Sequence, residues 1–110
     1  MHGKTYLQIT TTCDDRQALE QLARLLIAEK IAACAQLSGP LHSHYWWEGK
    51  CQSAEEWQLQ VKTRDEFQAA VYELVAKNHP YRVPQLVTTR LEHVAADYAS
   101  WIDESLKPAG

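Results

Sequence analysis

The sequence predicts a single α+β domain with the ferredoxin-like, split β-α-β arrangement, covering residues 1–110. Apolar residues alternate with period two in some segments and recur with helical spacing in others. Along the chain these segments follow the order β-α-β-β-α-β-α, so that two β-α-β crossovers share a central hairpin. A chain of 110 residues builds one hydrophobic core of this kind and leaves no room for a second domain.

The first strand and helix are expected over residues 6–12 and 15–30. Residues 6–12 alternate between two faces and are rich in β-branched side chains, as is typical of a strand. Asp14 followed by Gln17 is a plausible cap pair for the helix, and the apolar residues after this pair keep a helical period.

A long strand over residues 33–47 and a returning strand over 57–63 should form the central hairpin. Gly39-Pro40 interrupts the first of these strands, which suggests a β-bulge or an edge position. Residues 48–50 supply the turn. Apolar and polar residues alternate cleanly in the returning strand, which should therefore pair back onto the first.

The second half of the domain is expected to contain a helix, a strand and a short final helix. Thr63 and Glu66 form a capping-box pattern before a helix over residues 67–78. A connector with two prolines then leads to a fourth strand over 85–91. The final helix is identified by an apolar stripe that consists of Tyr98, Trp101, Ile102 and Leu106.

The charge balance argues against nucleic-acid binding. Eleven Lys and Arg residues stand against fourteen Asp and Glu residues, a net charge of -3, which leaves no basic surface for phosphate backbones. No apolar segment approaches the roughly 18 residues that a membrane-spanning helix needs. The first ten residues lack the apolar core of a secretory signal. We therefore expect a cytoplasmic protein with neither nucleic-acid nor membrane partners.

Motifs of common enzymes are missing from the sequence. It contains no glycine-flanked serine nucleophile and no glycine-rich phosphate loop, because its four glycines are scattered. Small ferredoxin-like enzymes that hydrolyse acyl phosphates need an anion-binding loop after the first strand, whereas residues 10–15 are acidic. We expect a protein that is not an enzyme, and a small hydrolase is the weakest alternative.

Three histidines are candidates for metal binding, and each has a structural alternative. His42 and His44 lie two apart on the expected second strand, so their imidazoles should share one face and suit a soft divalent ion. Two solvent-exposed histidines at a sheet edge would show the same spacing. His79 follows the second helix, where a histidine either caps the last carbonyls or has a functional role.

The three cysteines are an odd number without CxxC spacing, so neither a disulfide framework nor a structural zinc site is expected. Cys34 lies in an apolar run and is expected to pack in the core, with metal binding as the alternative. Cys13 and Cys51 occupy an expected loop and an expected turn, and we expect both thiols to be exposed.

Aromatic residues concentrate on the central hairpin, which carries Tyr45, Trp46, Trp47 and Trp57. Adjacent tryptophans on a strand must face opposite sides, so only one face can pack against the helices. The other face needs a cover. An interface between copies of the chain is the favoured explanation, and a ligand-stacking platform is the alternative.

Several of these motifs occur in the order that one known family has. They are LIAEKIAACA at residues 26–35, SHYWWEGK at 43–50, Glu56, Lys62-Thr63, HPYRVP at 79–84 and YASW at 98–101. On these motifs the sequence resembles the CutA-type divalent-cation tolerance proteins from about residue 6 to 106. The resemblance implies a homotrimer that is similar in architecture to the P-II signalling proteins, with long hairpins that bridge subunits. It also implies tolerance to copper and other divalent cations, with no metal needed for folding.

Carried over position by position, the resemblance implies a binding cleft between subunits. The cleft would be formed by Tyr45, Trp47, Gly49, Lys50, Glu56, Lys62, Thr63, Tyr81 and Pro84. His79, with Cys13 as a substitute ligand, would hold the metal ion. Thr10 and Asn78 replace the Cys and His of copper-binding members, and Gln85 replaces the usual Glu. Ion pairs and aromatic packing at a trimer interface would use the same residue types as the cleft.

The sequence therefore favours a non-enzymatic homotrimer of the divalent-cation tolerance class, implicated in the response to metal ions. Copper, another divalent cation or a small anionic ligand would bind at the clefts between subunits. The alternative is a P-II-like signalling module that binds a small ligand or a protein partner at the same clefts.

Overall fold

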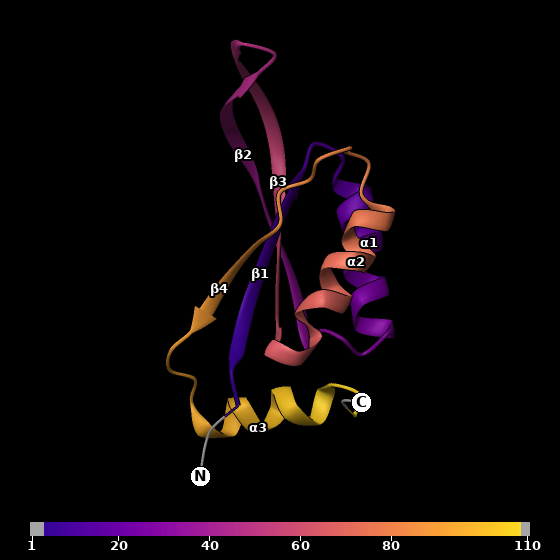
Figure 1. Cartoon of the computed structure of the whole chain (residues 1–110), viewed down its shortest axis with the longest axis vertical. Helices are drawn as coiled ribbons and strands as arrows, with labels where there is room; N and C mark the ends of the chain where they lie inside the picture. Colours follow the sequence, from indigo (N-terminus) through magenta and orange to yellow (C-terminus); the bar gives the residue numbers. More distant parts are fainter. Residues whose placement is uncertain (1–3, 109–110) are drawn as a thin grey trace.

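The computed structural model describes residues 4–108 and has the predicted α+β fold (Figure 1). Its elements are β1 (Tyr6–Cys13), α1 (Arg16–Ala28), β2 (Cys34–Trp47), β3 (Lys50–Arg64), the short 3-10 helix η1 (Asp65–Phe67), α2 (Gln68–Asn78), β4 (Val87–Leu91) and α3 (Ala96–Ser105). The predicted order of strands and helices is confirmed. Within residues 4–108, no helix is long and apolar enough to cross a bilayer.

A four-stranded antiparallel sheet in the order β2-β3-β1-β4 forms the centre of the fold. β3 lies between β1 and β2, and β1 lies between β3 and β4, so each strand–helix–strand unit is split by a strand of the other. Helices α1 and α2 lie side by side on one face of the sheet (Figure 1). Helix α3 crosses the end of the sheet that is opposite the hairpin tip.

The hydrophobic core fills the space between the sheet and the α1–α2 pair. Helix α1 buries Leu19, Leu22 and Leu26, and the strands contribute residues such as Ile9 and Val61. Side chains alternate along a strand, so the neighbours of these two strand residues point to the other face of the sheet.

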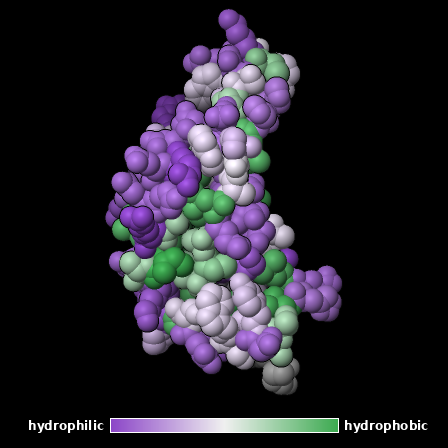
Figure 2. All heavy atoms as spheres, turned by 180° about the vertical axis from the view of Figure 1, so that it is seen from behind, coloured by the Kyte–Doolittle hydropathy of each residue, from purple (hydrophilic) through white to green (hydrophobic). Residues whose placement is uncertain are grey.

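Apart from contacts with α3 at its end, the other face of the sheet is open in the part of the chain that is described. Half-buried glutamines, Gln8, Gln58 and Gln60, lie on this face. Seen from behind, the molecule also brings hydrophobic residues to its surface in the middle, with hydrophilic residues on both sides (Figure 2). The surface seen in this view is thus mixed in polarity.

The β2–β3 hairpin extends far beyond the rest of the sheet. Its last pair is Trp47 with Lys50, whereas β1 reaches only to Trp57 on β3. The molecule is consequently 50 Å long and only 25 by 21 Å across. The returning strand begins at Lys50 rather than at the predicted residue 57. Residues 50–55 form a largely exposed two-stranded ribbon, so no apolar alternation marks them in the sequence.

The predicted bulge is present in β2, where the register against β3 shifts between Ser38 and Leu41. Gly39 has a φ of +141°, which side-chain-bearing residues rarely adopt. A Cβ atom at Gly39 would lie 2.7 Å from Cδ1 of Trp57. The backbone angle and the close approach of the indole therefore both require glycine at the bulge.

Two predicted helix caps were wrong. Asp15, not Asp14, caps α1, because its backbone is extended and its Oδ1 accepts a hydrogen bond from the Ala18 N–H at 3.2 Å. Thr63 caps no helix, because it lies within β3 and faces the core. There it is fully buried, and its hydroxyl donates to the Ile31 carbonyl at 2.7 Å.

Helix α3 shows only half of its predicted apolar stripe. Ile102 and Leu106 are buried, whereas Tyr98 and Trp101 are 39% and 42% exposed. The two exposed rings contact each other in a tilted arrangement, with ring centroids 5.3 Å apart and an interplanar angle of 31°. The helix therefore anchors through its C-terminal half.

Asp103 is the polar anchor of α3. It accepts hydrogen bonds from Arg64 Nη1 and Tyr6 Oη, each at 3.0 Å, and from Lys4 Nζ at 3.4 Å. The other amino nitrogen of Arg64 pairs with Glu66 at 2.9 Å. Burial alone would raise the pKa of Asp103, but the hydrogen bonds from Arg64, Tyr6 and Lys4 outweigh it and hold that pKa below its ordinary value.

The cysteines only partly follow expectation. Cys13 is fully buried and not exposed in a loop, because it is the last residue of β1 and its side chain faces the core. Cys51 is exposed, as expected. Cys34 is half-buried rather than enclosed in the core, and its Sγ lies 3.7 Å from the Tyr98 hydroxyl. All three thiols are free.

Candidate functional site

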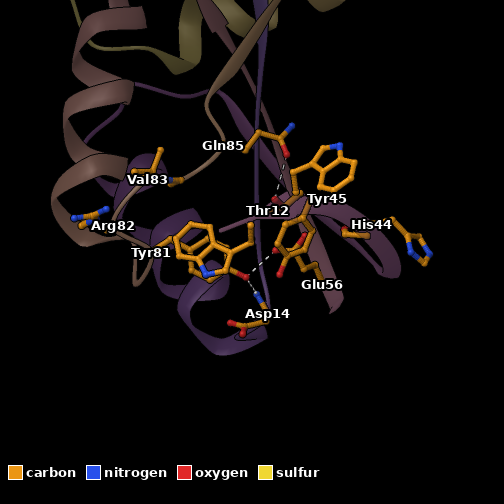
Figure 3. A pocket seen from close by; sticks show the side chains of 13 residues that line it. Thr12, Asp14, His44, Tyr45, Glu56, Tyr81, Arg82, Val83 and Gln85 are labelled. Carbon is orange, nitrogen blue, oxygen red and sulfur yellow. Dashed lines mark hydrogen bonds between the residues drawn. The ribbon is translucent and has the colours of Figure 1, made fainter. Parts of the chain in front are cut away.

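A groove with a volume of about 960 Å³ opens at the root of the hairpin (Figure 3). One wall consists of residues 43–47 of β2, and the other consists of residues 81–85 in the connector between α2 and β4. Thr12, Asp14 and Glu56 complete the lining from the end of β1 and from β3. The floor is thus formed by β1 and β3, and the two walls are formed by the hairpin and by the connector.

The Tyr81 hydroxyl joins the two acidic residues of the groove (Figure 3). It donates to Glu56 Oε2 at 2.7 Å and accepts the backbone N–H of Asp14 at 2.9 Å. Burial, and then the hydrogen bond to the Glu56 carboxylate, raise the pKa of Tyr81 far above its ordinary value. The phenol is therefore a fixed proton donor at physiological pH.

Glu56 is buried, with 7% of its surface exposed. It lies on β3, next to the bulge of β2. It pairs with Leu41 in the β2–β3 register, directly after the shift at Gly39-Pro40. Its Oε2 is held by Tyr81, and no hydrogen bond within residues 4–108 involves Oε1. The groove thus contains a carboxylate that has one oxygen free to accept.

His79 ties the connector to the end of β1. Its Nδ1 accepts the Tyr81 N–H at 3.0 Å, so Nε2 carries the proton and donates to the Thr12 carbonyl at 2.8 Å. The His79 ring lies 4.8 Å from the Tyr81 ring between centroids. The imidazole thus bonds the end of β1 and not the last carbonyls of α2. One of those carbonyls, that of Leu74, accepts a hydrogen bond from the Asn78 side-chain amide at 2.8 Å.

Within one chain, the possible ligand atoms of His79 and Cys13 are already engaged in hydrogen bonds. Both nitrogens of His79 are engaged in hydrogen bonds. Burial raises the pKa of Cys13, and its Sγ accepts the Asp15 N–H at 3.4 Å. Within residues 4–108, no group of three or more His, Cys, Asp and Glu side chains is placed to share a metal ion.

The structure brings together part of the predicted cleft. Five of its residues line the groove, namely Tyr45, Trp47, Glu56, Tyr81 and Pro84. Gly49 and Lys50 lie at the exposed hairpin tip. Lys62 bonds Gln36 at 3.3 Å, and Thr63 is buried in the core, so both lie elsewhere on β3.

Sequence reasoning missed Thr12 and Asp14, which also line the groove. The acidity of residues 10–15 does not by itself predict contact with a connector far along the chain. The Thr12 hydroxyl lies 3.2 Å from Gln85 Oε1 and donates to it. Gln85 lies before β4, which begins at Val87 and not at the predicted residue 85.

The model of the CutA1 divalent ion tolerance protein family matches residues 7–105, nearly the whole chain. The chain belongs to this family. It is 37% identical over 103 residues to the divalent-cation tolerance protein CutA of Escherichia coli O45:K1 (strain S88 / ExPEC), which covers 94% of this chain and 92% of that relative. The CutA protein of Shigella flexneri gives the same identity and coverage. The resemblance found in the sequence is confirmed.

Solved structures of CutA1 proteins have the same fold. The crystal structure of CutA1 from Oryza sativa matches with a TM-score of 0.92 and 32% identity, covering 96% of this chain and 97% of that one. The structure of CutA from Archaeoglobus fulgidus, described as a periplasmic divalent cation tolerance protein, matches with a TM-score of 0.89 and 33% identity. It covers 93% of this chain and 99% of that one. The long hairpin and the C-terminal helix are therefore features of the CutA1 fold.

Proposed function

We propose that this chain is the subunit of a non-enzymatic homotrimer that acts in divalent-cation tolerance and binds a small ligand or a metal ion in clefts between subunits. The exposed aromatic hairpin carries the proposal. Trp46, Trp47 and Tyr45 are 77%, 52% and 43% exposed on a ribbon that projects past the sheet. Removing apolar surface from water gains roughly 25 cal/mol for each Å², so another copy of the chain is a favourable cover.

The position of the groove supports the cleft. One of its walls, residues 43–47, belongs to the same exposed ribbon. A subunit that packs on the ribbon would therefore also border the groove and close it. Gly49, Lys50 and Lys62 of a neighbouring chain are our candidates for completing the cleft.

Light scattering on the full chain tests the assembly. We expect a mass about three times the 12.6 kDa of one chain at micromolar concentration. The double variant Trp46→Ala/Trp47→Ala should show a lower mass, or should assemble only at a higher protein concentration. Leu25→Ala is the matched control, because Leu25 is 40% exposed on α1, away from the hairpin. A mass of one chain for the unaltered protein would refute the trimer.

Copper or another divalent cation is the metal we propose, bound by the assembled protein. His79 and Cys13 are the proposed ligands, and they would first have to give up the hydrogen bonds described above. Reduced protein dialysed against Cu(I) and a panel of divalent ions is analysed by plasma mass spectrometry. One copper per chain that is lost in His79→Ala and kept in His42→Ala would support these ligands. Retention in both variants would assign the metal to other residues, and no retention would favour a small ligand.

A P-II-like signalling role is the second candidate, favoured by one observation. Val83 is 74% exposed at the edge of the groove, in a connector that belongs to no strand or helix. Exposed loops beside a ligand site are common contact points for protein partners. Capture experiments from lysate, with unaltered protein and with Val83→Asp, would support this role if one specific partner were lost in the variant.

We propose a cytoplasmic location for the protein. Because the relative from Archaeoglobus fulgidus is described as periplasmic, the location needs its own test. Fractionation of cells that express the native chain, followed by detection with an antibody, should recover it with cytoplasmic markers. Release with the periplasmic fraction would contradict the proposal.

A further inference from the structure

Glu56 is a buried carboxylate without a positive partner in the described chain. Only 7% of its surface is exposed. Within residues 4–108, no Lys, Arg or His nitrogen forms an ion pair with it. Withdrawing a carboxylate from water is costly unless the charge is paired. The site is therefore one that a cation would stabilise.

The Tyr81 hydroxyl determines which oxygen of Glu56 is free. Its proton bonds Oε2 at 2.7 Å, and its oxygen accepts the Asp14 N–H at 2.9 Å, so it cannot also serve Oε1. The two basic side chains among the groove residues, Arg82 and His44, point away from Glu56 (Figure 3). No charge within the groove therefore competes for Oε1.

The walls of the groove favour an organic cation over a bare metal ion. The aromatic side chains of Tyr45, Trp46 and Trp47 belong to the groove lining, and aromatic rings attract alkylammonium and guanidinium groups. Calcium and magnesium ions require about six or more oxygen ligands, whereas Glu56 and Asp14 supply the only carboxylates in the groove lining. An organic cation with a delocalised charge and an apolar body therefore suits the groove better than a metal ion does.

We infer that the groove binds a small organic cation, whose alkylammonium or guanidinium group pairs with Glu56 Oε1 and packs on the aromatic residues of the hairpin. This inference names the ligand class for the cleft in the proposed function. All the residues that it uses come from one chain, and a subunit that packs on the hairpin in the proposed trimer would border the same groove.

Agmatine, which carries both an ammonium and a guanidinium group, is a suitable probe. Isothermal titration and tryptophan fluorescence on the full chain should show saturable binding, with n-butanol as the uncharged control. Glu56→Gln keeps an acceptor for the Tyr81 hydroxyl and removes the charge, so agmatine affinity should fall about tenfold or more. Glu55→Gln is the matched control, because Glu55 is exposed, is adjacent in sequence and does not line the groove. It should bind as the unaltered protein does.

Equal agmatine affinity in Glu56→Gln and the unaltered protein would overturn the inference, and so would binding no stronger than that of n-butanol. A variant that binds nothing but assembles less tightly would mean that a basic residue of a neighbouring subunit is the partner of Glu56, which also overturns it. Thermal unfolding of each variant confirms that it is folded.

Light scattering on the same samples separates the two proposals. A single-chain mass with Glu56-dependent binding would refute the trimer alone, and a trimer without binding would refute the organic cation alone.

Discussion

Arg64 and Asp103 form a 3.0 Å ion pair that joins strand β3 to the C-terminal helix, and the guanidinium of that pair is almost removed from water. The Arg64 side chain is 8% exposed and the Asp103 side chain 26%. Removing one partner of a buried, hydrogen-bonded charge is costlier than losing an exposed pair, and Arg64 would keep only its ion pair with Glu66.

Asp103→Asn should therefore lower the free energy of unfolding by about 2 kcal/mol at pH 7. The asparagine keeps the size of the side chain but loses the charge that faces Arg64. Urea denaturation measures the effect. Glu104→Gln, an exposed substitution on the same helix, is the control and should change little.

The same carboxylate predicts a dependence on pH. The pKa of Asp103 is lower in the folded chain than in the unfolded chain, where an aspartate titrates near about 3.9. Its stabilising contribution is complete above that value and is lost as the pH falls through the folded pKa. The difference in unfolding free energy between the unaltered protein and Asp103→Asn should narrow on acidification below about pH 4. A difference that stayed constant in that range would contradict this assignment.

Gly39→Ala tests the bulge. The added methyl group would meet the Trp57 ring, and a φ of +141° is strained for alanine. We expect a loss of about 3 kcal/mol in unfolding free energy from strain and overpacking together. Gly49→Ala is the control, since Gly49 has a φ of +76° but open space around it, and it should lose only about 1 kcal/mol. Equal losses would show that Trp57 does not restrict residue 39.

Tyr81→Phe removes the hydroxyl that bridges Glu56 and the Asp14 backbone. A loss of about 2 kcal/mol at pH 7 is expected, because one of the two hydrogen bonds involves a charged carboxylate. The pKa of Tyr81 is raised in the folded chain, so its contribution is complete below the unfolded value of about 10 and is lost at higher pH. Chemical denaturation from pH 7 to 11 should show the two proteins converging only above about pH 10. Convergence at lower pH would refute the shift.

Thiol labelling tests the burial of Cys13. The exposed Cys51 should react first with a thiol reagent at pH 8, and the fully buried Cys13 should react only when the chain unfolds. Peptide mapping by mass spectrometry assigns each modified cysteine. Labelling of Cys13 at the rate of Cys51 in the folded protein would mean that the end of β1 opens.

The sequence predicted most of the fold because its periodic segments lie where one face is buried. The alternation before and after Val61 identified β3, but it could not identify residues 50–55, whose two faces are both largely exposed. Thr63 shows another limit. It matches a cap pattern, yet the core contact with the Ile31 carbonyl decides its role.

The candidate site was only partly predictable for a related reason. Tyr81 and Glu56 came from the family resemblance, and they do meet in the groove. The bond from His79 to the Thr12 carbonyl spans 67 positions of the chain, and no local pattern encodes it. The placement of Asp14 beside Tyr81 likewise depends on the tertiary fold.

The polar anchor of α3 has a consequence for the speed of folding and unfolding. Tyr6 and Asp103 are 97 positions apart, whereas the strands of the β2–β3 hairpin follow one another directly. Distant contacts are entropically expensive to close early, so the hairpin should form before α3 docks. Substitutions at Asp103 should then mainly accelerate unfolding, and those at the bulge should mainly slow folding. The hairpin end of the sheet would thus determine how fast the chain folds, and the α3 end would determine how long it stays folded.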